Sequence, residues 1–317
     1  MKESGLFYPD GTYQSEKSIR RRLLMDGNDL PHFDTPLIDE KDFNYWSKRF
    51  TDRQKEFEEL AEGFNNVVEI TLPGQSVINF IGDLHVGAIA TDYSRIEREI
   101  EAVITTPRSY VILMGDIVDG FFFNPAQMNQ IEQPPEQFHY THAMIKYLAE
   151  HNKLLVGFGG DHDNWAKKMG LSCYAHFAKE AKAHYVNGLG FITLNINDQE
   201  YRIAGAHRLP GRSMYNKNHP GMRAEKFGGA RGADVIVHGH THQKGYALSP
   251  VSEFGNQTRR VHFISIGPYK STDEYGQKLG FPQQKEVELF GSAVILDQDK
   301  KHIRYFDDIL EANQIQA

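Results

Sequence analysis

The feature that most constrains the fold of this chain is a set of five short apolar runs, each followed by a turn that carries aspartate or histidine. The runs are rich in β-branched residues, which is typical of buried strands. Because ligands in α/β folds bind at the carboxyl ends of strands, we expect the five turns to meet at one edge of the fold. The turns are Gly82-Asp83-Leu84-His85, Gly115-Asp116-Ile117-Val118-Asp119, Gly160-Asp161-His162-Asp163, Gly205-Ala206-His207 and Gly239-His240-Thr241-His242.

From residue 66 onward, short apolar runs alternate with longer helical stretches, and this alternation predicts an α/β fold. The later runs follow one another with little helix between them, which predicts a second sheet rich in antiparallel pairs. We expect helices at Arg95–Ile104 and His142–His151. The predicted strands are Val77–Phe80, Tyr110–Met114, Leu154–Phe158, Tyr201–Ala204, Val235–Val237, His262–Ile266 and Ala293–Leu296.

Residues 1–65 have a different pattern. Aromatic and aliphatic residues recur at a roughly helical spacing between residues 42 and 64, mixed with charges, which predicts one amphipathic helix after a partly extended arm. We therefore expect an N-terminal arm and helix over residues 1–65 and a main domain over residues 66–317.

Composition narrows the classes of protein and of site. The formal net charge is −7, which gives no support to a protein that coats nucleic acid through its overall charge. A single cysteine, Cys173, and the lack of an apolar leader or membrane-spanning run favour a cytoplasmic protein that does not enter a membrane. The 15 histidines, several of them in short motifs, are a signal of metal chemistry.

The side chains in the five turns indicate which kind of metal site they would form. Carboxylate and imidazole ligands together suit manganese, iron, zinc or nickel, and the lack of thiolates argues against a structural zinc site. A lone histidine at a strand end is more often structural, so the prediction depends on all five turns together. Seven ligands are too many for one tetrahedral ion and fit two divalent ions that share a bridging carboxylate.

The order of these motifs resembles that of the calcineurin-like metallophosphoesterases over roughly residues 75–270. The resemblance implies a four-layer α/β/β/α sandwich with a two-metal site at one edge, so that residues 66–317 would be a metallophosphoesterase catalytic domain. It also implies a role for each residue. Asp83, His85 and His242 would hold the first ion, Asp116 would bridge, and Asp161, His207 and His240 would hold the second. His162 would contact the scissile phosphate or the leaving oxygen, and Asp119 would orient His162.

Two positions depart from the family pattern. The family usually has asparagine where this chain has Asp161, and the added negative charge should tighten cation binding and weaken the Lewis acidity felt by a substrate. Protein phosphatases of the family carry arginine directly after Gly-Asp-x-x-Asp, where this chain has Gly120 followed by three phenylalanines. This difference argues against a protein phosphatase.

A basic segment lies between the fourth and fifth turns and could attract a polyanionic substrate to the metal edge. Its cations are Arg202, Arg208, Arg212, Lys217, Arg223, Lys226 and Arg231, with Glu225 as the acid among them. From this segment we predict Arg208, Arg212 and Arg223 as substrate-binding residues, and a solvated loop is the alternative. Trp165 and Tyr215 would either stack on a base or serve as packing residues.

Together these features predict a two-metal phosphoesterase, with manganese favoured, that hydrolyses phosphodiester bonds of nucleic acid or a nucleotide through a metal-activated hydroxide. Within the family, the Asp-Leu-His-Val-Gly opening and the basic segment are most similar to the Mre11/SbcD-like nuclease branch and related bacterial or phage phosphoesterases. One alternative is a phosphomonoesterase that acts on a small phosphorylated substrate. A non-catalytic binding scaffold is a weaker alternative, because every ligand position holds a competent side chain.

The basic segment generates a prediction about substrate size. Replacing Arg208, Arg212 and Arg223 by glutamine should weaken binding of a polynucleotide and flatten its salt dependence, because each lost cation releases one fewer counterion. Cleavage of a small chromogenic diester should change little. Salt titrations of polynucleotide binding and steady-state rates on the diester measure the two effects, and equal losses on both would contradict a role in binding long substrates.

Overall fold

The structure is a computed structural model that describes residues 5–7, 13–15, 43–62, 66–120, 129–165, 181–213, 215–252, 258–272, 274–278, 280 and 283–317. The chain divides into two compact units, residues 1–59 and 60–317. In the first unit, β1 (Gly5–Phe7) pairs with β2 (Tyr13–Ser15) in antiparallel fashion. Helix α2 (Phe43–Glu62) begins in this unit and confirms the helix predicted over residues 42–64.

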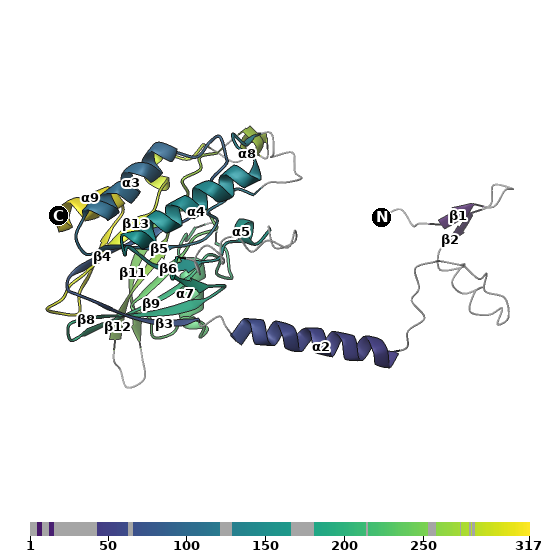
Figure 1. Ribbon diagram of the computed structural model, residues 1–317, viewed down its shortest axis with the longest axis horizontal. Coiled ribbons are helices and arrows are strands. Elements are labelled where there is room, and N and C mark those ends of the chain that lie inside the picture. Colours follow the sequence, from purple (N-terminus) through teal and green to yellow (C-terminus); the bar gives the residue numbers. More distant parts are fainter. Residues whose placement is uncertain are drawn as a thin grey trace. The chain divides into compact units, whose positions relative to one another are not determined.

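The second unit contains two six-stranded sheets among its described residues (Figure 1). The first sheet has the order β14-β13-β4-β5-β6-β7, and the second has the order β11-β12-β10-β9-β8-β3. The strands of the first sheet are β4 (Ser76–Ile81), β5 (Ser109–Leu113), β6 (Leu154–Phe158), β7 (His184–Val186), β13 (Ser292–Leu296) and β14 (Ile303–Phe306). Those of the second are β3 (Val67–Leu72), β8 (Gly190–Ile196), β9 (Gln199–Ala206), β10 (Val235–His238), β11 (Gly245–Ser252) and β12 (Thr258–Ser265).

All seven predicted strands are confirmed, but the prediction for the second sheet is wrong in two respects. Within the described strands that sheet is mixed: β12–β10, β10–β9 and β8–β3 are parallel pairs, and only β11–β12 and β9–β8 are antiparallel. The parallel pairing of β9 with β10 follows from the connection between them, which contains helix α7 (His219–Lys226) and acts as a crossover. The run at residues 293–296, in turn, joins the first sheet, where β13 pairs antiparallel with β4.

Helices cover the outer faces of both sheets, so the unit has four layers. Helices α3 (Tyr93–Thr105), α4 (Pro134–Glu150) and α9 (Ile309–Gln316) pack on the first sheet, and α7 packs on the second (Figure 1). One hydrophobic cluster fills the space between the sheets, and two others lie under the helices. Strand β4 is buried at every position because it has a hydrophobic layer on each face. This arrangement confirms the predicted α/β/β/α sandwich.

Local sequence signals explain where several helices begin and end. The Asp92 carboxylate caps α3 by accepting the N–H of Arg95, and the Asp308 carboxylate caps α9 by accepting the N–H of Leu310. The predicted helices at residues 95–104 and 142–151 are confirmed as α3 and α4, although α4 begins earlier, at Pro134. The remaining described helices are α5 (Asp161–Trp165), α8 (Glu274–Lys278) and the 3₁₀ helix η4 (Glu286–Glu288).

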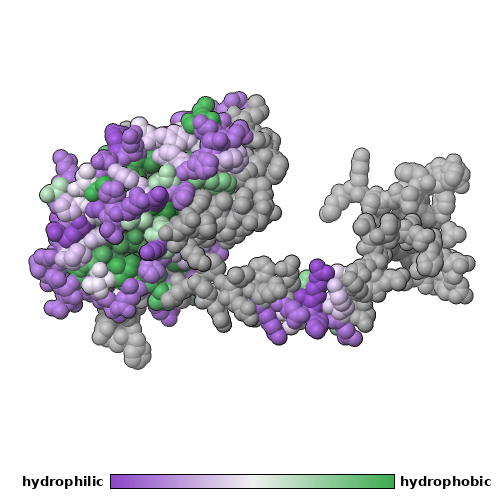
Figure 2. All heavy atoms as spheres, in the orientation of Figure 1, coloured by the Kyte–Doolittle hydropathy of each residue, from purple (hydrophilic) through white to green (hydrophobic). Residues whose placement is uncertain are grey.

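The exterior is largely hydrophilic on the face drawn in Figure 2, with smaller hydrophobic areas between the charged side chains. Among the described helices, none combines the length and the apolar character that crossing a bilayer would require.

Candidate metal centre

The five turns identified in the sequence meet at one edge of the sandwich, although they come from both sheets. Three follow β4, β5 and β6 of the first sheet, and two follow β9 and β10 of the second. Contacts join the two sheets there: Asp83 Oδ1 lies 3.3 Å from His242 Nε2, and Asp116 Oδ2 lies 3.0 Å from His207 Nε2. Convergence of the candidate ligands is therefore a property of the fold.

Five of the seven candidate ligands have a left-handed backbone, which is uncommon for residues other than glycine. Asp83, His85, Asp116, His240 and His242 have φ angles of 49°, 51°, 49°, 67° and 52°. Such conformations cost free energy and cluster at functional sites, where the surrounding structure enforces them. The turns therefore adopt backbone conformations of higher free energy, and these conformations direct the side chains toward one another.

Two glycines leave room for the carboxylates at the centre. A Cβ atom on Gly160 would lie 2.0 Å from the main-chain nitrogen of Asp116 and 2.3 Å from its Oδ1. A Cβ atom on Gly239 would lie 2.4 Å from Oδ2 of Asp83. A side chain at either position would displace a candidate ligand, which explains glycine before Asp161 and before His240.

The first candidate cluster consists of Asp83, His85 and His242, whose ligand atoms all lie within 4.8 Å of one another. Nε2 of His85 faces Nε2 of His242 at 3.0 Å, and the other ring nitrogen of His85, Nδ1, lies 2.8 Å from Asp119 Oδ1. Burial lowers the pKa of His85 to about 4, so the ring is neutral near pH 7 and holds its Nδ1 proton toward Asp119. Its Nε2 lone pair is then directed at the cluster.

The second candidate cluster consists of Asp116, His207 and His240. Nδ1 of His207 donates to the carbonyl of Met114 at 2.9 Å, which leaves Nε2 as the ring nitrogen that faces the Asp116 carboxylate. Burial alone would lower the pKa of His207, but the Asp116 carboxylate outweighs it and raises the pKa to about 10. The site thus attracts a positive charge, which can be a proton or a metal ion.

The Asp83 and Asp116 carboxylates are both held in the ionised form. Burial alone would raise the pKa of Asp83, but its bond to His242 and the charge of His207 keep the pKa below the usual range. The pKa of Asp116 is likewise lowered, because contact with His207 outweighs burial. Main-chain donors add to this: the N–H of His240 reaches Asp83 at 3.1 Å, and the N–H of His162 reaches Asp116 Oδ1 at 2.8 Å.

Asp161, the residue that replaces the family's asparagine, lies beside the second cluster without being part of its closest group. Its Oδ2 is 3.3 Å from Nδ1 of His240 and 3.3 Å from Nη1 of Arg208. Asp161 is more exposed than the other two candidate aspartates, with 41% of its side chain accessible. The additional charge of this aspartate is therefore partly balanced by Arg208.

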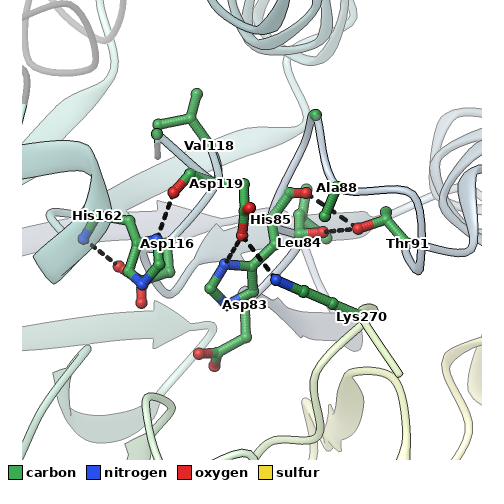
Figure 3. Close-up of polar contacts among 12 residues, drawn as sticks. Asp83, Leu84, His85, Ala88, Thr91, Asp116, Val118, Asp119, His162 and Lys270 are labelled. Carbon is green, nitrogen blue, oxygen red and sulfur yellow. Dashed lines mark hydrogen bonds and ion pairs between the residues drawn. The ribbon is translucent and has the colours of Figure 1, made fainter. Parts of the chain in front are cut away.

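The contacts of Asp119 differ from the role expected for it. The Asp119 carboxylate contacts His85, and it is the main-chain carbonyl of Asp119 that accepts a hydrogen bond from Nδ1 of His162 at 2.5 Å (Figure 3). The expectation that the Asp119 side chain orients His162 needs correction, because the turn after β5 directs the carboxylate to His85. With Nδ1 of His162 protonated toward a carbonyl, its Nε2 is the nitrogen that can exchange a proton. The ring also stacks on Trp165 at 4.0 Å.

The donor set fits two divalent ions. Two ring nitrogens 3.0 Å apart, and a ring nitrogen 3.0 Å from a carboxylate, are arrangements that a cation can stabilise. A third group, His85, Asp119 and His162, also has metal-like spacing.

The residues predicted to bind substrate are all exposed. Among the described contacts, one joins these residues to the candidate metal centre, between Arg208 and Asp161. Arg223 lies over the Phe227 ring at 5.0 Å, and the structure places Arg212 without such a contact. Tyr215 is 95% exposed, so it is not a packing residue. The basic segment is partly neutralised, since Lys217 pairs with Glu288.

Asp163 stands in the third turn but was not among the predicted site residues. Asp163 is buried, and its Oδ1 accepts the N–H groups of Ile117 and Val118, while its Oδ2 accepts that of Gly160. It therefore ties the turn after β6 to the turn after β5. Its position two residues after Asp161 could have indicated a role in the site, but its contacts with main-chain N–H groups cannot be predicted from the sequence. Lys270 contacts Asp119 but belongs to no sequence motif, so it was not predicted as a site residue.

Asp163 generates a prediction about stability. In Asp163→Asn the amide nitrogen would replace one of the accepting oxygens, so that two donors would oppose each other in a buried place. We expect a loss of about 1–3 kcal/mol in the free energy of unfolding, measured by urea denaturation without metal. The exposed residue Asp198 provides the control, because Asp198→Asn should change stability by less than about 0.5 kcal/mol. Equal stability of the two variants would contradict this role.

The chain is similar to known phosphoesterases. The family model for calcineurin-like phosphoesterases matches residues 76–244, more than half of the chain. A predicted phosphoesterase from Streptococcus pneumoniae is 11% identical over 74% of this chain and 91% of that one, with a TM-score of 0.35. A metallophosphoesterase from Sphaerobacter thermophilus is 16% identical over 73% and 87%, with a TM-score of 0.33.

A zinc complex of Vps29 from Entamoeba histolytica is 11% identical over 72% of this chain and 96% of that one, with a TM-score of 0.32. No curated protein matches the chain at a significant level of sequence similarity. The matched family segment begins with β4, ends beyond His242 and so contains all five turns. The protein belongs to the calcineurin-like phosphoesterase family.

Proposed function

We propose that this protein is a two-metal phosphodiesterase that acts on nucleic acid or a nucleotide. The observation that carries the proposal is the pair of adjacent clusters, Asp83–His85–His242 and Asp116–His207–His240, in which ionised carboxylates and imidazoles are held at close range. In this proposal Asp116 would be shared by the two ions, and Asp161 would complete the second set of ligands. Two divalent ions bound there would supply a nucleophile from water near neutral pH and would neutralise the phosphate oxygens.

The protein's own residues prepare the site before any substrate binds. The lowered pKa values of Asp83 and Asp116 supply two negative charges that favour cations. The neutral His85 offers its Nε2 without first losing a proton, which metal binding would otherwise require. The main-chain donors on both carboxylates fix their orientation, so that little rearrangement is needed when ions enter.

His162 is proposed as the proton donor to the leaving group. Its main-chain N–H anchors it to Asp116, its Nδ1 is bound to the carbonyl of Asp119, and its ring stacks on Trp165. These three contacts restrict rotation of the ring and leave Nε2 as the nitrogen that can give a proton to a departing alkoxide. Asp119 supports this geometry through its main chain.

The preference for a diester rests on two features of the sequence and on one contact. Gly120 stands where protein phosphatases of the family carry arginine, so a cation that would grip the terminal phosphate of a phosphoprotein is missing at that position. The exposed cations of the basic segment favour a polyanion, and Arg208 connects that segment to Asp161. Phosphomonoester hydrolysis is the competing activity.

The proposal is tested by hydrolysis of three substrates by the manganese-loaded protein: bis-p-nitrophenyl phosphate, p-nitrophenyl phosphate and end-labelled single-stranded DNA. We expect cleavage of the diesters and loss of nearly all activity in Asp116→Ala, because both ions would lose a shared ligand. Circular dichroism shows whether the variant is folded. A rate on the monoester that exceeds the diester rates would favour the alternative, and no hydrolysis by a metal-loaded protein would reject the enzyme.

The leaving group separates the role of His162 from that of the ions. A sugar alkoxide is a strong base and needs a proton as the P–O bond breaks, whereas p-nitrophenolate leaves readily without one. His162→Asn should therefore lose about 10²–10⁴-fold in turnover on a nucleotide diester and far less on the p-nitrophenyl diester. His240→Ala is the control and should lose both activities alike. Equal losses in His162→Asn would reject the proton-donor role.

A further inference from the structure

The described part of the segment between β12 and β13 is here called the crossing segment (residues 267–272, 274–278, 280 and 283–291). It borders the candidate metal centre although it contains no recognised motif. The N–H of Tyr269 donates to the carbonyl of Asp83 at 2.9 Å, and Nε2 of Gln284 donates to the carbonyl of His242 at 3.2 Å. The N–H of Ser271 donates to the carbonyl of Ala90 at 3.1 Å. These bonds tie the crossing segment to the turns after β4 and β10.

Lys270 of this segment turns its side chain into the protein, with 12% of it exposed. Its ammonium nitrogen lies 3.2 Å from Oδ1 of Asp119, a carboxylate whose side chain has no exposed surface (Figure 3). The same Oδ1 lies 2.8 Å from Nδ1 of His85, and Oδ2 of Asp119 accepts a hydrogen bond from Gln130. An ammonium, a ring N–H and an amide therefore hold the Asp119 carboxylate from three directions.

This arrangement distinguishes the third metal-like group from the other two. His85, Asp119 and His162 have the spacing of metal ligands. In this group, however, the Lys270 ammonium contacts the Asp119 carboxylate. A buried carboxylate needs a paired positive charge, and in this group the chain itself supplies it. Among the described residues, the side-chain nitrogens closest to the carboxylates of the first and second groups belong to histidines, which are themselves candidate metal ligands.

We propose that Lys270 is a positioning residue of the metal centre: its ammonium holds the Asp119 carboxylate on Nδ1 of His85 and so keeps Nε2 of His85 turned toward Asp83 and His242. The inference rests on the proposed function, because the ion whose affinity Lys270 would set is the one bound by the first cluster. The same ammonium stands beside the carboxylate that a third ion would need, so the centre would hold two ions.

The physical effect acts through the histidine. A ligating histidine is fixed in tautomer and ring orientation by the acceptor of its other N–H, and loss of such an acceptor typically costs 10–100-fold in metal affinity. Without Lys270, the Asp119 carboxylate would lack the ammonium that balances its charge, and its hold on His85 would weaken. The effect should appear in ion binding, while substrate contacts stay as they are.

The experiment compares Lys270→Met, Lys270→Gln and Lys270→Arg with the wild-type chain by calorimetric titration with Mn²⁺. In the Met and Gln variants, one of the two sites should bind Mn²⁺ about 10–100-fold more weakly, and the charge-conserving Arg variant should recover most of that loss. At saturating Mn²⁺, KM for bis-p-nitrophenyl phosphate should stay within about twofold of wild type. The Gln variant serves if the Met variant does not fold.

Lys153 provides the matched control, because it is also partly buried and its ammonium donates to the carbonyl of Thr106 at 2.7 Å. Lys153 directly precedes β6 and so lies away from the five turns. Lys153→Met should affect stability alone. Mn²⁺ affinity in the Lys270 variants equal to wild type would overturn the inference, as would a raised KM with unchanged Mn²⁺ affinity. A wild-type chain that binds no Mn²⁺ would instead reject the proposed function, so the two failures are distinguishable.

Discussion

The candidate site depends on the close approach of carboxylates and imidazoles that can share a cation between them. Nε2 of His85 faces Nε2 of His242 at 3.0 Å, and the Asp116 carboxylate faces Nε2 of His207 at 3.0 Å. Each contact brings together two groups that can share one positive charge. Protons can supply that charge, as the raised pKa of His207 shows, but the neutral state of His85 leaves the first cluster best suited to a metal ion.

The sandwich provides the rigidity that keeps these groups together. Three of the turns follow strands of one sheet and two follow strands of the other, so the hydrophobic cluster between the sheets fixes the distance between the two halves of the site. The left-handed backbones of the candidate ligands and the close approach of Gly160 to Asp116 are tolerated because the strands before them are buried. Asp163 then joins two turns of the first sheet through three main-chain N–H groups.

The sequence was sufficient for the strands and turns because each apolar run and each glycine-containing turn is a local signal. The sequence was not sufficient to predict the strand pairing in the second sheet, since the parallel pairing of β9 and β10 depends on how the intervening α7 packs. Local sequence signals also could not predict which part of Asp119 contacts His162. The path of one turn decides whether the carboxylate or the main-chain carbonyl does so. Lys270 comes from a segment far along the chain, and only the folded arrangement brings its ammonium to Asp119.

The central claim is that this edge of the sandwich binds two ions, with the chain supplying the positive charge at the third metal-like group. Anomalous diffraction from crystals of the manganese-loaded protein tests it most directly. The account predicts two peaks, one about 2.0–2.3 Å from ligand atoms of Asp83, His85 and His242 and the other at similar distances from Asp116, His207 and His240. A single peak, or a peak among His85, Asp119 and His162 with Lys270 displaced, would contradict it.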